Sequence, residues 1–492
     1  MSEVSAQNGA QYPFAYGIEE EISLRHLPGS DFSDQDLRDA LNLYQLSNKD
    51  VFYTSRMDST GGGLYIDRSH LELTTPEYAT VNELTARAQS HEQKEIAIVT
   101  AFLKGQQQSE RRNRVVGIHR RIVDTRGNTY GLHDNYGFLK TPQLLNIVAP
   151  IVSGHLATRS FVTGAGYVTP RSLLFAQKAQ HVDAVMGYEY NDTMFRTTSD
   201  EGGTRFETRC NDINISPWAI RIRIGSTAIA LVLGRTPAGD NLARLARELL
   251  GTEQQWHKGP YRYNQMHLKQ DGSLRARRNL FRAIRYQMQM AETFLSSDMA
   301  KYGPEPPVEL ALIAHGLYDY CKDVIHVVTG DAPYTSLADR ADWAAKVMLI
   351  DRRIERDKQD DPKMRRTRQD ATAIKDDLAY DYIQVDNREP PVRVRYGTGY
   401  LLRDKKHFFA GEIDPAVVAQ AGKTPPSNMR GALRAELLKN YDVSTASWRS
   451  AALINDTTGN TITVSIDDPR THTFSPDQLD CLARARRRTH SL

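Results

Sequence analysis

The sequence predicts an α+β fold with one large N-terminal domain and one small C-terminal domain. Segments with the two-residue alternation of β-strands, such as FAYGIEEEISL at 14–24, are interleaved with segments of helical pattern, such as residues 82–104. Near the end, the cluster AGKTPPS at 421–427 interrupts the pattern, as is typical of a boundary between two units. We therefore expect a large domain over residues 1–415 and a small α/β domain over residues 416–492.

Composition and charge are those of an ordinary globular protein. Of 492 residues, 40% are hydrophobic and 25% are charged, and the net charge of +3 gives no general attraction to nucleic acid or to a membrane surface. The longest apolar stretch, STAIALVLG at 226–234, is shorter than the about 20 residues that span a bilayer. Neither a specific nucleic-acid partner nor a membrane is expected.

The cysteines and the N-terminus bear on the compartment. Cys210, Cys321 and Cys481 are odd in number and far apart, which argues against a disulfide framework and a CxxC metal site. The first residues lack the basic and apolar regions of a secretion signal. The sequence therefore predicts a cytoplasmic protein.

Local patterns predict the elements in order. FSDQDLRDALNLYQ at 32–45 is expected to be a helix capped by Ser33, and GGGLYID at 61–67 a strand. Residues 204–234 have a β-like pattern, which begins with Arg205, Glu207 and Arg209 on one face and ends in an apolar run entering the core. The remaining expectations are helices at 275–300, 336–357, 429–440 and 475–487, and strands at 447–455 and 460–466.

Two acids on the first predicted strand are the first candidate site. Glu19 and Glu21 are two residues apart and point to one face, whereas Glu20 points to the other. Mg²⁺ takes oxygen ligands from one or two carboxylates and from nucleotide phosphates. The alternative is an exposed acidic strand edge, which this pair alone does not exclude.

The stretch GGGLYIDRSHLELTTPE at 61–77 strengthens the metal hypothesis. Tyr65 and Asp67 share one strand face, and His70, Glu72 and Thr74 share one face of the short extended segment that follows. Glycines let phosphates approach the backbone closely, so the stretch suits a nucleotide–Mg²⁺ site with Asp67 as general base. The alternative is a glycine turn followed by a core histidine.

A third cluster, YGLHDNYG at 130–137, contains His133, Asp134 and Asn135. These residues are rich in hydrogen-bond donors and acceptors, but turns favour the same residue types. VTGAGYV at 162–168 lacks the third glycine of a dinucleotide fingerprint and is a weak signal.

Taken in order, several motifs resemble one known family. The chain is similar to the ligases and deamidases that act on Pup, the prokaryotic ubiquitin-like protein, from about residue 15 to 470. The resemblance implies a glutamine-synthetase-like large domain, with an antiparallel sheet cradle and flanking helices, joined to a small C-terminal domain. The motifs are GIEEE, LYIDRSHLELTTPE, YGLHDNY, VTGAGYV, QKAQHV, RFETRCNDIN, ADWAAK, DLAYDYI and TPPSNMRGALR.

The resemblance also implies ATP and Mg²⁺ as cofactors, with a small Pup-like modifier and target proteins with accessible lysines as partners. The site residues that it implies are Glu19, Tyr65 and Glu72 for the metal, Asp67 for catalysis, and Thr75, Trp448 and Arg205 for the nucleotide.

Three departures from the family pattern affect the nucleotide site. Gly63 stands where the family has an arginine that meets ATP, and Arg56 is the candidate to replace it. The family's HPEY is HLEL here, and the histidine of its RLHV segment is Glu207.

The resemblance leaves several functions open. A ligase would phosphorylate the C-terminal glutamate side chain of the modifier and join it to a target lysine, with Asp67 accepting the lysine proton. The 43 residues between Glu21 and Tyr65 favour this ligase, because the family's hydrolases carry a long insertion there. The two residues between Asp67 and His70 favour a deamidase or depupylase. The resemblance is also compatible with a divergent carboxylate–amine ligase and with a non-enzymatic protein that binds the modifier.

Overall fold

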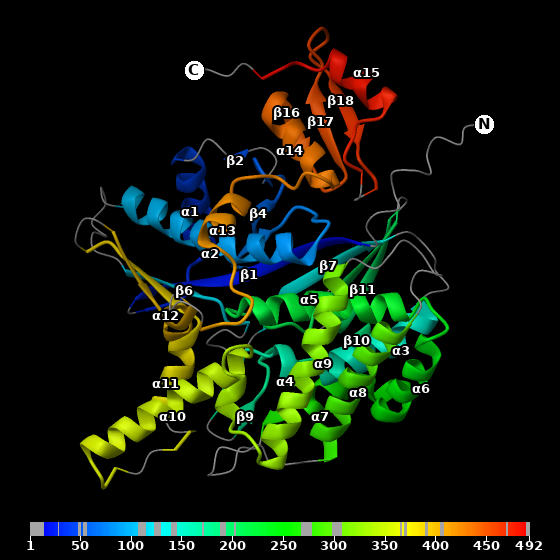
Figure 1. Ribbon diagram of the computed structural model, residues 1–492. Helices are drawn as coiled ribbons and strands as arrows, with labels where there is room; N and C mark the ends of the chain where they lie inside the picture. Colours follow the sequence, from blue (N-terminus) through cyan, green and yellow to red (C-terminus); the bar gives the residue numbers. More distant parts are fainter. Residues whose placement is uncertain are drawn as a thin grey trace.

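The computed structural model confirms the α+β fold (Figure 1). A large unit is built around a 12-stranded sheet, and a smaller C-terminal unit stands at one end of the molecule, next to β2 and β4. The structure describes residues 14–27, 29–47, 51–52, 57–106, 115–122, 129–138, 145–169, 172–186, 193–200, 203–266, 278–297, 308–364, 367–368, 371–388, 392–403, 408–468 and 471–488.

The large sheet runs in the order β10-β11-β12-β7-β1-β5-β4-β3-β2, and β6, β14 and β15 continue it from the second half of β1. All of its strand pairs are antiparallel except β10 with β11. The strands are β1 Ala15–Leu27, β2 Val51–Phe52, β3 Met57–Asp58, β4 Gly63–Asp67, β5 His70–Thr74, β6 Val115–His119, β7 Leu132–Phe138, β10 Ala184–Met186, β11 Thr193–Asp200, β12 Gly203–Thr208, β14 Tyr382–Asp386 and β15 Arg393–Tyr396.

Two long helices cover one face of this sheet, which we call the core face. The core face carries Ile18, Ile22 and Tyr136, all buried, and the Tyr136 hydroxyl donates to the carbonyl of Ile224 on α5. The opposite face, called the site face, carries the acids discussed below. The covering helices are α2 Val81–Gly105 and α5 Pro217–Leu233.

The β-like prediction for residues 218–234 is wrong, because this segment is most of helix α5. Nearly all of its side chains are buried, so the helix lacks the polar stripe that usually reveals the 3.6-residue period. Ser216 caps the helix by accepting from the Ala219 amide at 3.3 Å, and Pro217 opens its first turn. The prediction that the segment enters the core is confirmed.

Ser33 caps α1 as predicted, since its hydroxyl accepts from the Asp36 amide at 3.2 Å. Helices α3, α4 and α6 to α12 form the lower half of the large unit in Figure 1. No described helix is both long and apolar enough to cross a bilayer. The helices are α1 Asp34–Ser47, α3 Leu145–Thr158, α4 Ser160–Thr163, α6 Gly239–Leu250, α7 Gly259–Tyr263, α8 Arg278–Ser296, α9 Val308–Thr329, α10 Asp342–Asp360, α11 Ala371–Tyr380 and α12 Thr398–Arg403, and a small sheet joins β8 Tyr167–Val168, β9 Leu173–Leu174 and β13 Gln265–Met266.

The C-terminal unit has a hydrophobic core of its own, whose buried residues begin at Leu433. Helix α13 precedes this unit and packs on α2 of the large unit, and the predicted boundary at 415/416 stays a prediction. The elements here are α13 Pro415–Ala421, α14 Arg430–Asn440, β16 Val443–Ala446, β17 Ser450–Ile454, β18 Thr461–Ser465 and α15 Pro476–Arg484.

Candidate active site

The alternation of β1 separates its three consecutive acids as predicted. Glu19 and Glu21 point to the site face, whereas Glu20 points into the core. There Glu20 accepts from Arg120 at 2.9 Å and lies 3.1 Å from the His91 ring. Glu20 is thus a buried structural charge, and only its two neighbours are available to a ligand.

Strand register brings the acids of distant segments into one row. Glu21 of β1 lies opposite Glu72 of β5, and Glu72 lies opposite Tyr65 of β4. Side chains directly opposite in an antiparallel pair are close neighbours. The Tyr65 hydroxyl accordingly donates to Glu72.

Asp67 stands at the end of the same row, beside a tight turn between β4 and β5. Arg68 and Ser69 form the turn with positive φ angles of 42° and 69°, which suit a two-residue hairpin. The His70 ring after the turn stacks on Tyr130 with ring centroids 4.1 Å apart. Carboxylate oxygens of Asp67, Glu21 and Glu72 lie within 4.8 Å of one another. We call these three residues the acidic cluster.

The acidic cluster lacks a protein cation, because no described Lys, Arg or His side chain forms an ion pair with its members. Burial, followed by the charges of Glu19 and Glu21, raises the pKa of Glu72 to about 9. Burial and the Glu72 charge also raise the pKa of Tyr65. A hard divalent cation with oxygen ligands would relieve this repulsion, so the donor set fits Mg²⁺.

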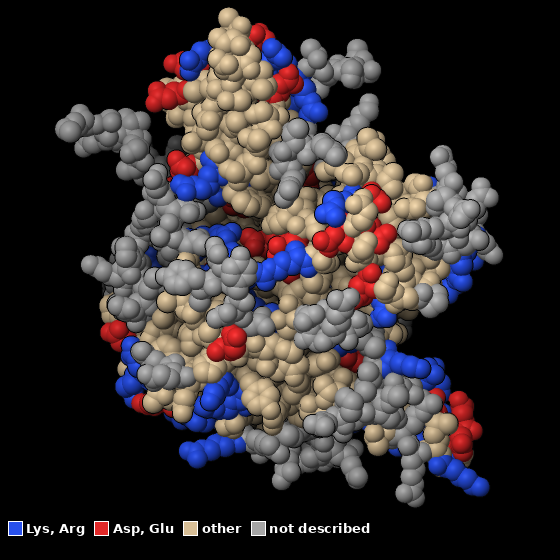
Figure 2. Space-filling model, turned by 180° about the vertical axis from the view of Figure 1, so that it is seen from behind, with Lys and Arg blue, Asp and Glu red and all other residues tan. Residues whose placement is uncertain are grey.

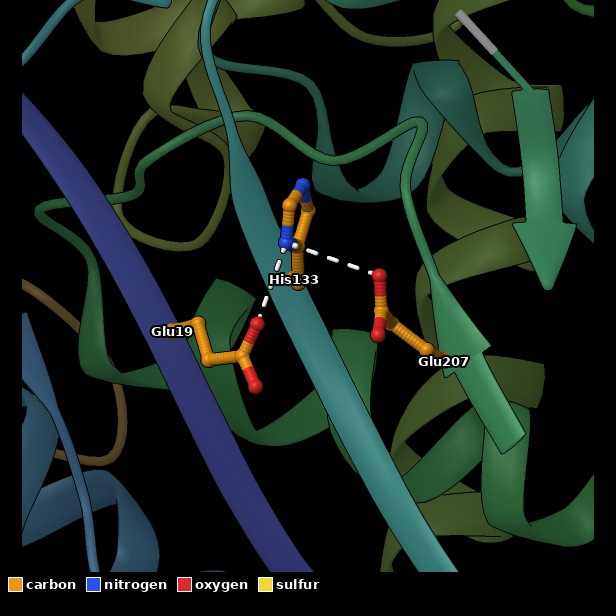
Figure 3. A group of neighbouring side chains, drawn as sticks. All are labelled: Glu19, His133 and Glu207. Carbon is orange, nitrogen blue, oxygen red and sulfur yellow. Dashed lines mark hydrogen bonds and ion pairs between the residues drawn. The ribbon is translucent and has the colours of Figure 1, made fainter. Parts of the chain in front are cut away.

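A second group lies on the neighbouring strands of the same face (Figure 3). His133 of β7 stands between two acids: its Nδ1 lies 3.3 Å from Glu19 of β1 and 3.6 Å from Glu207 of β12. The next residue, Asp134, points to the core face and pairs with Arg223 at 3.0 Å. The cluster predicted at 130–137 is therefore split between the two faces.

Three arginines surround this second group. Glu207 is completely buried and pairs with Arg205 at 3.0 Å and Arg209 at 3.3 Å, as their predicted shared face implies, and with Arg196 of β11 at 2.7 Å. Arg205 also reaches Glu19 at 3.0 Å and is 33% exposed. We call Glu19, His133, Glu207 and these three arginines the arginine cluster.

In the arginine cluster, charged neighbours reverse the effect of burial on the pKa values. Burial alone would raise the pKa of Glu19, but Arg205 and His133 lower it to about 2. Burial opposes protonation of His133, yet Glu19 and Glu207 raise its pKa. From behind, acidic and basic side chains lie next to each other in a hollow beneath the C-terminal unit (Figure 2).

The structure divides the predicted metal ligands between the two clusters. Tyr65 and Glu72 belong to the row of the acidic cluster, whereas Glu19 bonds within the arginine cluster. Glu19 is nevertheless close enough for its charge to raise the pKa of Glu72. The sequence did not assign a role to His133 or Glu207, since the pairing of β1, β7 and β12 cannot be read from local pattern.

The glycines of the opening stretch contact the protein itself. A Cβ on Gly63 would lie 2.4 Å from Thr74 Oγ1, which accepts from the Gly63 amide at 2.7 Å. The arginine that the resemblance implies at this position would therefore collide with Thr74 of β5. A phosphate contact at these glycines stays a prediction, and Arg56 lies outside the described residues.

The two remaining nucleotide candidates have defined partners. The buried Thr75 hydroxyl accepts from the Ile18 amide at 2.9 Å. Trp448, in the C-terminal unit, lies under the guanidinium of Arg434 at 4.7 Å from its ring centroid, and Arg434 also bonds the Gly61 carbonyl at 2.9 Å. Through Arg434, the structure thus places Trp448 near the glycines 61–63 at the start of β4.

Comparisons with known proteins point to one family. The model of the Pup-ligase protein family matches residues 14–452. The chain is 29% identical over 188 residues to a Pup–protein ligase of Acidimicrobium ferrooxidans, covering 35% of this chain and only 40% of that protein. It is 25% identical over 399 residues to a Pup–protein ligase of Bifidobacterium longum subsp. infantis, covering 76% and 75%. A depupylase of Acidothermus cellulolyticus is 25% identical over 241 residues, covering 46% and 45%.

Solved structures show the same fold. The complex between Pup and its ligase PafA matches with a TM-score of 0.71 at 20% identity, over 97% of this chain and 94% of that chain. The structure of PafA in complex with ADP matches with a TM-score of 0.62 at 18% identity, over 93% and 96%.

Proposed function

The chain belongs to the Pup-ligase family, and from this premise we propose that it joins a Pup-like modifier to lysines of target proteins at the expense of ATP. ATP would phosphorylate the side-chain carboxylate of the modifier's C-terminal glutamate. A target lysine would then displace the phosphate and form an isopeptide bond. The observation that carries the proposal is the juxtaposition of the acidic cluster and the arginine cluster on one sheet face.

The acidic cluster supports the use of Mg²⁺. Glu72, Glu21 and the Tyr65 hydroxyl offer only oxygen atoms, and Glu19 lies beside them. When bound, Mg²⁺ offsets the negative charge of the nucleotide phosphates during phosphoryl transfer. The four residues would hold it without help from a nitrogen ligand.

The arginine cluster supports the binding of the transferred phosphoryl group. Arg205 is held from two sides by Glu19 and Glu207, so its guanidinium is oriented before any ligand arrives. Guanidinium groups bind phosphate oxygens with charge-assisted hydrogen bonds. Thr75 accepts one hydrogen bond from the protein and retains its own proton to donate to the nucleotide.

Asp67 supports the proton transfer. It is the least buried acid of its cluster, and no described side chain donates a hydrogen bond to it. In the proposed step its carboxylate accepts a proton from the target lysine ammonium. The neutral amine attacks the acyl phosphate and forms the C–N bond. The C–O bond to the phosphate breaks, and the second amine proton leaves with the phosphate as HPO4²⁻.

One observation supports a second candidate function. The hairpin after Asp67 has a two-residue turn, Arg68–Ser69, and the resemblance associates this short spacing with the hydrolytic branch of the family. A depupylase or deamidase would use the same site, with Asp67 orienting a water or attacking an amide.

The test is an ATP-dependent conjugation assay. The purified protein is incubated with Mg²⁺-ATP, a glutamate-ending Pup and a lysate, beside a glutamine-ending Pup without targets that is followed by mass spectrometry. Slower-migrating lysine conjugates with phosphate release establish the ligase. A gain of about one dalton on the glutamine form establishes the deamidase, and no reaction in either arm contradicts both.

A further inference from the structure

Gly61, the first of the three glycines at 61–63, packs against the backbone of the C-terminal unit. Gly61 has a φ of 80°, and a Cβ there would lie 2.7 Å from the Gly431 carbonyl oxygen of α14. A Cβ on Gly431 would in turn lie 2.7 Å from Cβ of Pro76, in the segment that follows β5. Helix α14 therefore touches the chain just before β4 and just after β5, the two strands that carry Tyr65, Asp67 and Glu72.

Arg434 of α14 ties these segments together from a buried position, since it is only 1% exposed. Its Nε donates to the Gly61 carbonyl at 2.9 Å, and its Nη2 donates to Glu77 at 2.8 Å. Its Nη1 donates to the Trp448 carbonyl at 2.8 Å, and the guanidinium carbon lies 4.7 Å from the Trp448 ring centroid. One planar group thus joins the entry to β4, the exit from β5 and the tryptophan of the C-terminal unit.

We propose that Arg434 is a positioning residue of the reaction, which holds Trp448 and the β4–β5 hairpin in one fixed arrangement around the nucleotide. The inference rests on the proposed function of this site. Arg434 does not reach the site face itself and acts through Gly61, Trp448 and Glu77. Loss of its contacts would let the C-terminal unit shift against the hairpin, and the nucleotide would lose its aligned surroundings.

Arg430, one helical turn earlier, provides a matched control. It donates from Nε and Nη2 to Glu77 at 3.0 and 2.6 Å, and from Nη1 to the carbonyls of Ile466 and Asp467. Both arginines therefore anchor α14 to the same carboxylate. Of the two, only Arg434 contacts Gly61 and Trp448. A comparison of the two arginines therefore separates the anchoring of α14 from the positioning of Trp448 and the β4–β5 hairpin.

The experiment compares Arg434→Lys with Arg430→Lys, which both keep a positive charge near Glu77. We expect both to lower the unfolding midpoint by similar amounts. The Kd of Mg²⁺-ATP, measured by direct titration, should rise roughly tenfold in Arg434→Lys and less than threefold in Arg430→Lys. The KM for ATP should rise in parallel, with kcat changed less. Equal Kd values in the two variants would overturn the proposal.

A double-mutant cycle tests whether Arg434 acts through Trp448. The loss of ATP affinity in Trp448→Ala combined with Arg434→Lys should be clearly smaller than the sum of the two single losses, because the residues form one unit. Additive losses would contradict this route. ATP binding is measured without the modifier, so this test does not depend on conjugation. A wild-type protein that binds ATP but conjugates nothing would contradict the proposed function, and the ATP affinities of the variants would still decide whether Arg434 is a positioning residue.

Discussion

The acidic cluster and the arginine cluster lie side by side on one sheet face, yet their charges are balanced in opposite ways. Glu21, Asp67 and Glu72 have no described protein cation among them, and the pKa of Glu72 rises to about 9. In the arginine cluster, three guanidiniums face two carboxylates, and the pKa of Glu19 falls to about 2. The difference supports the proposal that the first cluster binds a cation and the second an anion.

The largest expected effect concerns Asp67, the proposed general base within the acidic cluster. Asp67→Asn should lower turnover by roughly 10²–10⁴-fold while the Kd of Mg²⁺-ATP stays nearly unchanged, because the carboxylate acts on a proton rather than on phosphate. The measurement pairs conjugation rates with nucleotide titration. Conjugation at the normal rate would show that Asp67 is not the base.

Glu77 lies outside both clusters and pairs with two arginines, so it provides a third case for the comparison of charge balance. Burial would raise its pKa, but Arg430 and Arg434 lower it to about 2. Between its usual pKa of about 4.5 and 2, the unfolded chain binds the proton more readily, so the stability contributed by Glu77 is lost as pH falls through this window and is complete above it.

This contribution amounts to about 3 kcal/mol. Urea unfolding of wild type and Glu77→Gln at several pH values between 6 and 2.5 isolates it from the other carboxylates. The stability difference should be largest near pH 6 and shrink toward pH 2.5. A difference independent of pH would show that Glu77 is not ion-paired in solution.

Removing a charge from the arginine cluster should destabilise the protein. Glu207→Gln leaves Arg196, Arg205 and Arg209 with a single carboxylate, Glu19, and we expect a loss of about 2–3 kcal/mol in the free energy of unfolding. Urea unfolding at pH 7 without Mg²⁺ measures it. An unchanged stability would mean that the guanidiniums do not need Glu207.

The same change in the acidic cluster should have the opposite sign. Glu72→Gln removes a carboxyl group from two like neighbours, so the metal-free protein should gain roughly 1 kcal/mol. Its Mg²⁺ affinity, read from Mg²⁺ titration of nucleotide binding, should fall by about tenfold. If Glu72→Gln and Glu207→Gln change stability in the same direction, the contrast between the clusters is wrong.

Much of the fold and site was predictable where a short pattern decides the outcome. Alternation alone placed Glu19 and Glu21 on one face, and likewise Tyr65 and Asp67. Capping chemistry located the start of α1 at Ser33. The strand-like pattern of residues 218–234 misled because a fully buried helix has no polar side to reveal its period.

The sequence by itself determined which side chains are candidates for the chemistry and on which face of its strand each one lies, because both depend on neighbours a few residues away. Only the tertiary structure decided that β7 lies between β1 and β12, so that His133 and Glu207 join Glu19. It also decided that Gly61 meets Arg434, which is distant in the chain. Such contacts depend on strand order and on the packing of α14, and no local propensity encodes either one.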